Sequence, residues 1–118
     1  MSDQVAWLLE FEVKDGKDTE LSAVMQDMVA ATRNEPKTLN YEWSRSEDGT
    51  TYHIYERYAD SDAVLSHLQG FGENFAERFL AAITPTRFTV YGNPNEAARD
   101  VLSGLNPTYM ADAAGFAR

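Results

Sequence analysis

The sequence predicts an α+β domain in which two helices cover one face of a four-stranded antiparallel sheet. Three observations lead to this fold class. Apolar residues alternate in several short segments, they recur every three to four residues in two longer segments, and an Asp-Gly pair separates two of the short segments. These patterns are typical of strands, amphipathic helices and a hairpin turn, respectively.

The first strand and the first helix are predicted over residues 5–13 and 19–34. The strand, VAWLLEFEV, is apolar on both faces, because Trp7, Leu9 and Phe11 alternate with Ala6 and Leu8. The helix has apolar residues at the i, i+3, i+4, i+7 spacing. We expect Asp18 or Thr19 to cap the helix and Pro36 to end it.

The remaining core elements are a hairpin, a long helical segment and a last strand. The hairpin strands are predicted at residues 39–45 and 51–58, around the turn at Asp48-Gly49. Asp60 or Ser61 caps a helical segment that extends to about Ala82, with a break at Gly70 and Gly72 as an alternative. The last strand is predicted at residues 87–91, after Pro85.

The order βαββαβ predicts a ferredoxin-like arrangement of a single domain over residues 1–91. Residues 92–118 are expected to extend the same domain, with a short helix that Asn95 caps and that ends near Leu105. Tyr109, Met110 and Phe116 are possible anchors for the remaining tail. This tail could lie over a partner subunit, close the mouth of a pocket or pack on its own helices.

The sheet is predicted to be apolar on both faces, although two helices cover only one of them. The strand at residues 51–58 carries Tyr52, Ile54 and Tyr58 on one side and His53 and Tyr55 on the other. A second sheet is the natural cover for the free face, so we expect a homodimer joined by sheet-to-sheet packing. The pattern leaves open which face of the sheet lines a pocket.

Composition excludes several classes of function. The 118-residue chain has a net charge of −9, which opposes binding to nucleic acid and to anionic lipid. It has no cysteine, which removes disulfides and thiolate chemistry and fits the cytoplasmic location that we predict. No apolar run approaches the roughly 18 residues that a membrane span needs, and no charged-then-apolar leader opens the chain.

His67 is the candidate catalytic residue. On the second helix it lies at the edge of an apolar stripe, about 80° from the stripe centre at about 100° per residue. An imidazole there can reach a cavity, and its ordinary pKa of about 6.5 suits a general base near neutral pH. The alternative is a boundary histidine that binds a backbone carbonyl or water. His53 lies on another element and no HxxxH or HxH motif occurs, so we expect no metal site.

Three motifs resemble the antibiotic biosynthesis monooxygenase superfamily. They are ATRNEPKTLNYE at residues 31–42, YERY at residues 55–58 and SDAVLSHL at residues 61–68, and the resemblance covers roughly residues 5–91. It implies a dimeric α/β-barrel that carries out cofactor-independent monooxygenation of an electron-rich aromatic, such as a quinol or an anthrone. His67 occupies the position of the helix histidine of the quinol-oxygenase-like branch, which implies the role of catalytic base.

A second hypothesis is a non-catalytic dimer of the same fold that binds a small molecule. That branch commonly has another histidine a few residues later, whereas no histidine follows His67 here. Both hypotheses imply a small aromatic ligand and no cofactor. The candidate substrate-binding residues are Phe71, Phe75, Tyr55 and Trp43.

Several of these candidates, and other residues of the strands, also have a structural interpretation. Phe71 and Phe75 have the helical spacing of core residues, and the hydroxyls of Tyr41 and Tyr55 are expected to find partners within a core. Asn40 and Trp43 must lie on opposite faces of their strand. For Glu56 and Arg57 we expect an ion pair or a contact across the dimer.

Overall fold

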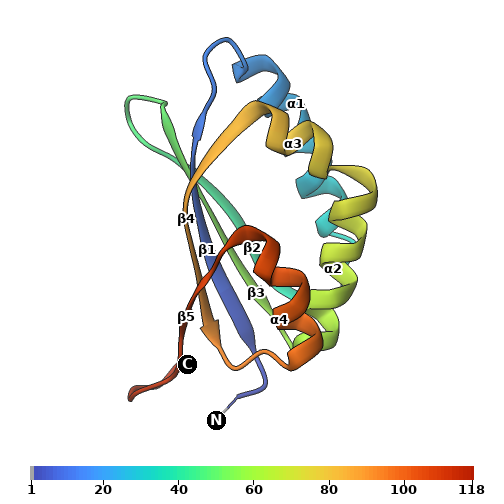
Figure 1. Ribbon diagram of the computed structural model, residues 1–118, viewed down its shortest axis with the longest axis vertical. Coiled ribbons are helices and arrows are strands. Elements are labelled where there is room, and N and C mark those ends of the chain that lie inside the picture. Colours follow the sequence, from blue (N-terminus) through green and yellow to red (C-terminus); the bar gives the residue numbers. More distant parts are fainter. Residues whose placement is uncertain (1) are drawn as a thin grey trace.

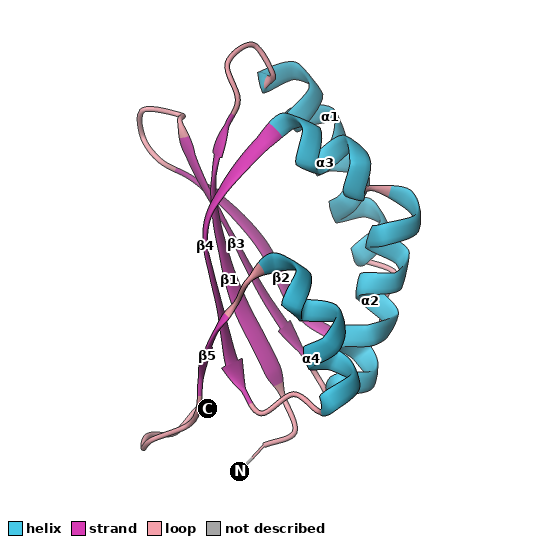
Figure 2. Ribbon diagram, viewed as in Figure 1, coloured by secondary structure: helices cyan, strands magenta, loops and turns pink. Residues whose placement is uncertain are grey.

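The computed structural model describes residues 2–118, which form a five-stranded sheet with helices on one of its faces (Figures 1 and 2). The strands are β1 (Val5–Val13), β2 (Thr38–Arg45), β3 (Thr51–Tyr58), β4 (Ile83–Gly92) and β5 (Thr108–Met110). The helices are α1 (Asp18–Thr32), α2 (Ser61–Asn74), α3 (Ala76–Ala82) and α4 (Glu96–Leu102), followed by the 3₁₀ turn η1 (Ser103–Leu105). Within residues 2–118, no helix combines the length and the apolarity needed to span a membrane.

The strand order β2-β3-β1-β4-β5 confirms the predicted ferredoxin-like sheet and adds one strand to it. Neighbours among β1 to β4 pair antiparallel, as the βαββαβ order requires. The prediction of four strands was incomplete, because β5 pairs parallel to β4 at the edge of the sheet. This strand has three residues after Pro107, which is too short for alternation to reveal it.

The hydrophobic core lies between the sheet and the helices. Trp7, Leu9 and Phe11 of β1 point into it and are at most 6% exposed. Buried side chains from α1, α2 and α3 cover them, namely Leu21, Val24, Met28, Val64 and Phe79. The opposite face of the sheet has no helix over it (Figure 2).

Two local predictions about the helices were wrong. The residue before α1 is Lys17, which makes no side-chain cap, so neither Asp18 nor Thr19 caps the helix. The break in the second helical segment falls at Phe75, whose φ of −131° separates α2 from α3, and not at the two glycines. Asp60 does cap α2, because its carboxylate accepts a hydrogen bond from the amide of Ala63.

The strand β4 begins at Ile83, earlier than predicted. Pro85 lies inside it, opposite Phe11, where the pairing with β1 shifts register between Glu10 and Phe11. Proline cannot donate a ladder hydrogen bond, and a bulge accommodates this loss. The longer strand connects α3 directly to the sheet.

The C-terminal segment extends the sheet of its own chain, a placement that the sequence did not predict, and it also contacts helix α4, in line with the expected packing on its own helices. Asn95 caps α4 as predicted, accepting a hydrogen bond from the amide of Ala98. The guanidinium carbon of Arg99 lies 4.3 Å from the centre of the Tyr109 ring, which ties α4 to β5. Phe116 is 80% exposed and therefore anchors nothing within this chain.

Candidate active site around His67

His67 lies in the middle of α2 and points into the core. It is only 6% exposed, whereas Leu68 and Phe71 on the same helix, which we expected to be buried, are only partly buried. Its imidazole ring lies against aromatic rings from two strands, with ring centres 5.1 Å from Tyr58 and 5.8 Å from Tyr41. The prediction of a boundary position was wrong, because the helix is rotated so that His67 faces the sheet.

Two carboxylates hold the two ring nitrogens of His67. Nδ1 lies 2.9 Å from Oε1 of Glu35 and 3.2 Å from Oε2 of the same residue. Nε2 lies 3.2 Å from Oε1 of Glu56, which also accepts a 2.5 Å hydrogen bond from the hydroxyl of Tyr58. We call Glu35, Glu56, Tyr58 and His67 the His67 network. The sequence suggested, as an alternative to a catalytic role, that His67 binds a backbone carbonyl or water. In the structure the hydrogen-bond partners of His67 are acidic side chains.

Each member of the network is positioned by a simple local feature. Glu56 and Tyr58 are two residues apart on β3, so both point to the helix side of the sheet. Glu35 follows α1, in a turn where its amide donates to the carbonyl of Thr32. The hydroxyl of Thr38 donates a 2.7 Å hydrogen bond to Oε1 of Glu35 and fixes the carboxylate next to the imidazole.

These contacts make His67 a cation at neutral pH. Burial opposes protonation, but the hydrogen bonds and negative charges of Glu35 and Glu56 outweigh it and raise the pKa of His67 to about 9. For Glu35, burial acts to raise the pKa, but hydrogen bonds from His67 and Thr38 and the imidazolium charge lower it below its usual value. Counted as one imidazolium and two carboxylates, the network carries one net negative charge.

The two tyrosines beside the network keep their protons. Burial, followed by the nearby charge of Glu56, raises the pKa of Tyr58 well above its ordinary value. The same two causes, in the same order, raise the pKa of Tyr41. Both phenols are therefore neutral hydrogen-bond donors over the physiological pH range.

The His67 network lies between two cavities. The inner cavity, of about 30 Å³, lies among apolar side chains of the core and is closed at one side by Glu56 and His67. The outer cavity, of about 180 Å³, is lined by Glu35 and His67 together with Thr32, Tyr41, Phe71 and Phe75. Only the outer cavity approaches the size of a small ring compound.

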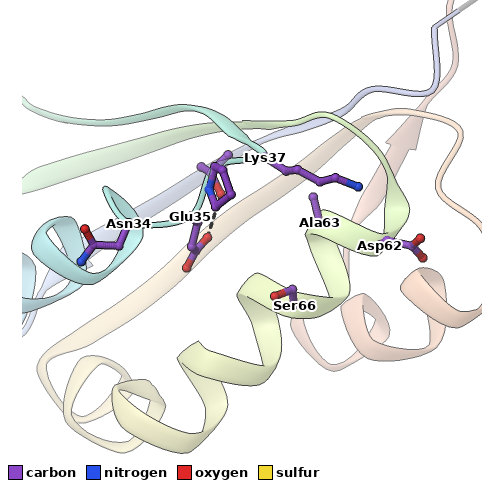
Figure 3. A pocket seen from close by; sticks show the side chains of 8 residues that line it. Asn34, Glu35, Lys37, Asp62, Ala63 and Ser66 are labelled. Atoms are coloured by element: carbon purple, nitrogen blue, oxygen red, sulfur yellow. Dashed lines mark hydrogen bonds between the residues drawn. The ribbon is translucent and has the colours of Figure 1, made fainter.

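A third hollow, the surface groove, adjoins Glu35 from the outside. It has a volume of about 420 Å³ and lies between the loop that carries Asn34 and Lys37 and the start of α2, where Asp62 and Ser66 lie. Figure 3 shows Glu35 pointing into this groove from the loop, so its carboxylate borders both the groove and the outer cavity. Glu35 thus connects His67 to the surface.

The structure brings together three of the five residues that the sequence singled out for the site. His67, Phe71 and Phe75 all line the outer cavity. Trp43 is on the helix side of the sheet but packs edge-on against Phe11 and Phe79, away from the cavity walls. Tyr55 does not belong to the site, because alternation along β3 places it on the opposite face, where it is 37% exposed.

Sequence reasoning missed Glu35 and Tyr58 as members of the site. For Glu56 and Arg57 it predicted an ion pair or a dimer contact without naming a partner. Glu56 faces the helices and pairs with His67, whereas Arg57 donates hydrogen bonds to Asn40 and Gln4. A signal was present, because Glu56 is an acid between Ile54 and Tyr58 on the apolar side of β3. Glu35 gave no such signal, because its role depends on a contact with a residue 32 positions away.

The opposite faces predicted for Asn40 and Trp43 are confirmed. Asn40 pairs with Arg57 on the free face of the sheet and accepts a 2.7 Å hydrogen bond from its guanidinium group, whereas Trp43 pairs with Ile54. The prediction that the Tyr41 hydroxyl finds a partner was wrong, because it is buried without one. Residues 2–118 contain no group of three or more histidine or acidic side chains that could hold a metal ion.

Comparisons with known proteins agree with this architecture. The sequence profile described as antibiotic biosynthesis monooxygenase matches residues 5–84. MupZ from Pseudomonas fluorescens is 26% identical, with a TM-score of 0.87 over 100% of this chain and 91% of that chain. SnoaB, a cofactor-independent oxygenase from Streptomyces nogalater, is 21% identical, with a TM-score of 0.65 over 80% of this chain and 96% of that chain.

A third solved structure, Rv0793 from Mycobacterium tuberculosis, is 25% identical, with a TM-score of 0.60 over 80% of this chain and 98% of that chain. No curated protein matches the chain by sequence. The family profile nevertheless spans most of the chain, including the loop of Glu35, the strand of Glu56 and the helix of His67. The chain therefore belongs to the antibiotic biosynthesis monooxygenase family.

Proposed function

We propose that this protein is a cofactor-independent monooxygenase that acts on a small electron-rich aromatic of the quinol or anthrone type. The observation that carries the proposal is the His67 network, which places a half-buried, hydrogen-bonded carboxylate, that of Glu35, beside an outer cavity with aromatic walls. Membership of the family and the shared fold of the cofactor-independent oxygenase SnoaB support the proposal.

The proposed reaction begins with loss of a proton from the aromatic substrate. The resulting anion transfers one electron to dioxygen, and the two radicals combine through a new carbon–oxygen bond to give a hydroperoxide. For an anthrone, the O–O bond and the remaining C–H bond at that carbon then break. A CH₂ group and O₂ become C=O and H₂O, so the substrate supplies all four electrons.

Glu35 is the proposed entry point for the substrate proton. His67 alone is a poor base at neutral pH, because its raised pKa means that the ring already holds both of its protons. Glu35 lines the outer cavity, and among the described residues its Oε2 atom makes one hydrogen bond, with Nδ1 of His67, whereas Oε1 makes two. A proton that arrives there neutralises the net negative charge of the network, and His67 distributes the charge between Glu35 and Glu56.

The imidazolium of His67 has a second proposed role, to stabilise the substrate anion. A fixed positive charge at the edge of an apolar cavity lowers the energy of an anion that forms there. Phe71 and Phe75 supply apolar walls that limit access of water. The acid–base unit is thus the whole network, with His67 positioned by two carboxylates, and the proposed base is Glu35.

A second candidate function is binding of a small aromatic molecule without chemistry. The observation that favours it is that both nitrogens of His67 already have carboxylate partners, so the network is internally satisfied. A buried ion pair of this kind also occurs where no reaction takes place. Such a protein would use the outer cavity as a binding site and leave its ligand unchanged.

We further propose that the protein is a homodimer joined through the free face of its sheet, and that it is cytoplasmic. Apolar side chains gather on this face, where Leu8 pairs with Tyr55 and where Tyr91 pairs with Met110. Tyr55, Tyr91 and Met110 are 37%, 42% and 49% exposed. Dimers are common in the family. The absence of cysteine supports the proposed cytoplasmic location.

The proposed function is tested by oxygen uptake of metal-stripped protein with a panel of quinols and anthrones. Wild type should exceed the spontaneous rate, and Glu35→Gln should reduce the enzymatic rate about 100-fold or more, as expected for loss of a general base. Glu47→Gln, on an exposed turn, is the matched control and should retain full activity. No uptake above the spontaneous rate across the panel, together with binding of these compounds, favours the non-catalytic function.

A further inference from the structure

The inner cavity is a small open space in a part of the protein where side chains normally leave little room. Its volume is about 30 Å³. Protein interiors are packed as densely as organic crystals, and voids larger than a water molecule are few. A single water needs a void of roughly 10–15 Å³, whereas a cavity that binds benzene has about 150 Å³. The inner cavity therefore admits a molecule as small as a diatomic gas and excludes an aromatic ring.

The lining of the inner cavity is apolar except at one end. Its polar lining residues are Tyr41, Glu56 and His67, and all the others have aliphatic, aromatic or methionine side chains. At the polar end, Nε2 of His67 and Oε1 of Glu56 already pair with each other. A buried water typically makes two to four hydrogen bonds, and most of this wall offers a water no partner. The lining therefore favours a small apolar occupant.

The inner cavity links the surface of the protein to the His67 network. Its lining includes Leu80 of α3, which is 40% exposed, and Leu105 of η1, which is partly buried. It also includes Glu56 and His67, which are only 5% and 6% exposed. A small apolar molecule can thus reach His67 from the side of Leu80, without passing through the outer cavity.

A single layer of side chains separates the inner cavity from the outer cavity. Four residues line both cavities, namely Met28, Tyr41, His67 and Phe71. A molecule in the inner cavity is therefore next to any aromatic compound that occupies the outer cavity. The layer is also able to open, because the side chain of Met28 is unbranched and has three rotatable bonds.

We propose that the inner cavity is a binding site for molecular dioxygen, beside the outer cavity that holds the aromatic substrate. Dioxygen is diatomic and apolar, so its transfer from water to apolar surroundings is favourable. It is the co-substrate of the proposed oxygenation, and the proposal rests on that function in taking the outer cavity as the site of the aromatic. It adds that the two substrates have separate sites and separate routes of entry.

The two sites have a consequence for the transfer of the electron. The substrate anion in the outer cavity gives one electron to dioxygen in the inner cavity, which leaves a substrate radical and superoxide. His67 lines both cavities, so its positive charge lies close to the negative charge before and after the transfer. The carbon–oxygen bond then forms when the side chains between the cavities, such as Met28, move aside.

The test uses dioxygen itself as the probe. Dissolved dioxygen is paramagnetic and accelerates the NMR relaxation of methyl groups near the places that it occupies. Relaxation is measured for the wild-type protein under dioxygen and under argon at the same pressure. The reporters are the methyl groups of Leu9 and Ile54, which line the inner cavity and are 6% and 1% exposed. The matched controls are Leu21 and Val24, which are fully buried and line neither cavity.

A variant that fills the inner cavity gives a second, independent measurement. Leu105→Phe adds volume at a partly buried lining residue that belongs to neither the His67 network nor the outer cavity. Leu39→Phe is the matched control, because it adds the same volume at an exposed position of β2. With a quinol or anthrone that the protein turns over, Leu105→Phe should raise the KM for dioxygen about fivefold and leave the KM for the aromatic unchanged.

Dioxygen should accelerate the relaxation of Leu9 and Ile54 several-fold more than that of Leu21 and Val24. Leu105→Phe should reduce this excess, and Leu39→Phe should retain it. Equal acceleration at all four residues of the wild type would overturn the proposal, and a cavity filled by water gives this result. An unchanged KM for dioxygen in a folded Leu105→Phe protein that has lost the excess would also overturn it.

Failure of this inference and failure of the proposed function give different results. Excess relaxation at Leu9 and Ile54, combined with no oxygen uptake for any quinol or anthrone, leaves the dioxygen site standing and rejects the oxygenase. Oxygen uptake that depends on Glu35, combined with equal relaxation at the reporters and the controls, rejects the dioxygen site and leaves the oxygenase.

Discussion

The Nε2 atom of His67 lies 3.2 Å from Oε1 of Glu56, and each of these side chains is only 7% exposed. The pair is therefore an ion pair inside the core, with Glu35 on the other side of the ring. Breaking such a pair by removing one partner leaves a buried charge without compensation. The state of His67 consequently depends on two residues that are distant from it in the sequence.

Replacing Glu56 by glutamine should lower the pKa of His67 from about 9 toward its model-peptide value of 6.5. The substitution keeps the shape of the side chain and removes the negative charge that favours the imidazolium. Titration of the His67 ring signals by NMR measures the shift. Glu10→Gln is the matched control, since Glu10 lies 3.5 Å from His53 on the other face of the sheet. If both substitutions lowered the pKa of His67 equally, the charge of Glu56 would not be the cause of the raised pKa.

Stability should decrease as the pH rises from about 6.5 to 9. Because the pKa of His67 is higher in the folded state, its contribution is complete below 6.5 and is lost through about 9. The size of this contribution is on the order of 3 to 4 kcal/mol, because each unit by which the pKa is raised corresponds to about 1.4 kcal/mol. Urea unfolding at several pH values measures it. His67→Gln should unfold with a flatter pH dependence, and an unchanged slope in this variant would reject the prediction.

The rate of the proposed oxygenation should be constant near neutral pH and decrease above about pH 9. The reason is that Glu35 is ionised throughout this range, whereas His67 loses its positive charge and leaves two carboxylates facing the substrate anion. The measurement is kcat/KM from initial oxygen uptake after subtraction of the spontaneous rate. A rate that increases up to pH 9 would instead identify neutral His67 as the base.

The substitution Tyr55→Glu should convert the proposed dimer to a monomer. Tyr55 is an exposed aromatic in the middle of the free face, and a carboxylate there would be buried without a partner in a sheet-to-sheet contact. Light scattering should give twice the 13.2 kDa chain mass for wild type and the chain mass for the variant. Val101→Glu, on the exposed side of α4, should remain dimeric. A monomeric wild type would exclude this contact.

The fold was largely predictable because most of its elements are specified by local patterns. Alternation placed β1 and β3 at their observed bounds, and Asp60 marked the start of α2. The strand β5 could not be predicted in the same way, since three residues gain their structure only by pairing with β4. The break at Phe75 could not be predicted either, because no glycine or proline stands at that position.

The candidate site was only half predictable, for a related reason. Phe71 was found from its helical spacing, and His67 was found as a titratable residue at the edge of that stripe, in the position of the family's helix histidine. The ionisation state of His67 was not predictable, because Glu35 and Glu56 reach it only in the folded chain. Tyr55 was assigned to the site although alternation with Ile54 and Glu56 places it on the other face.

The short strand β5 limits how the edge of the sheet at β4 can pair with strands of other molecules. Without it, β4 would present a long row of free amide and carbonyl groups, which is a template for aggregation through strand pairing. The three residues of β5 cover part of this row, and Pro107 just before them cannot donate to an incoming strand. The C-terminal segment thus protects one border of the sheet from polymerisation, and β2 is left as the longer open edge.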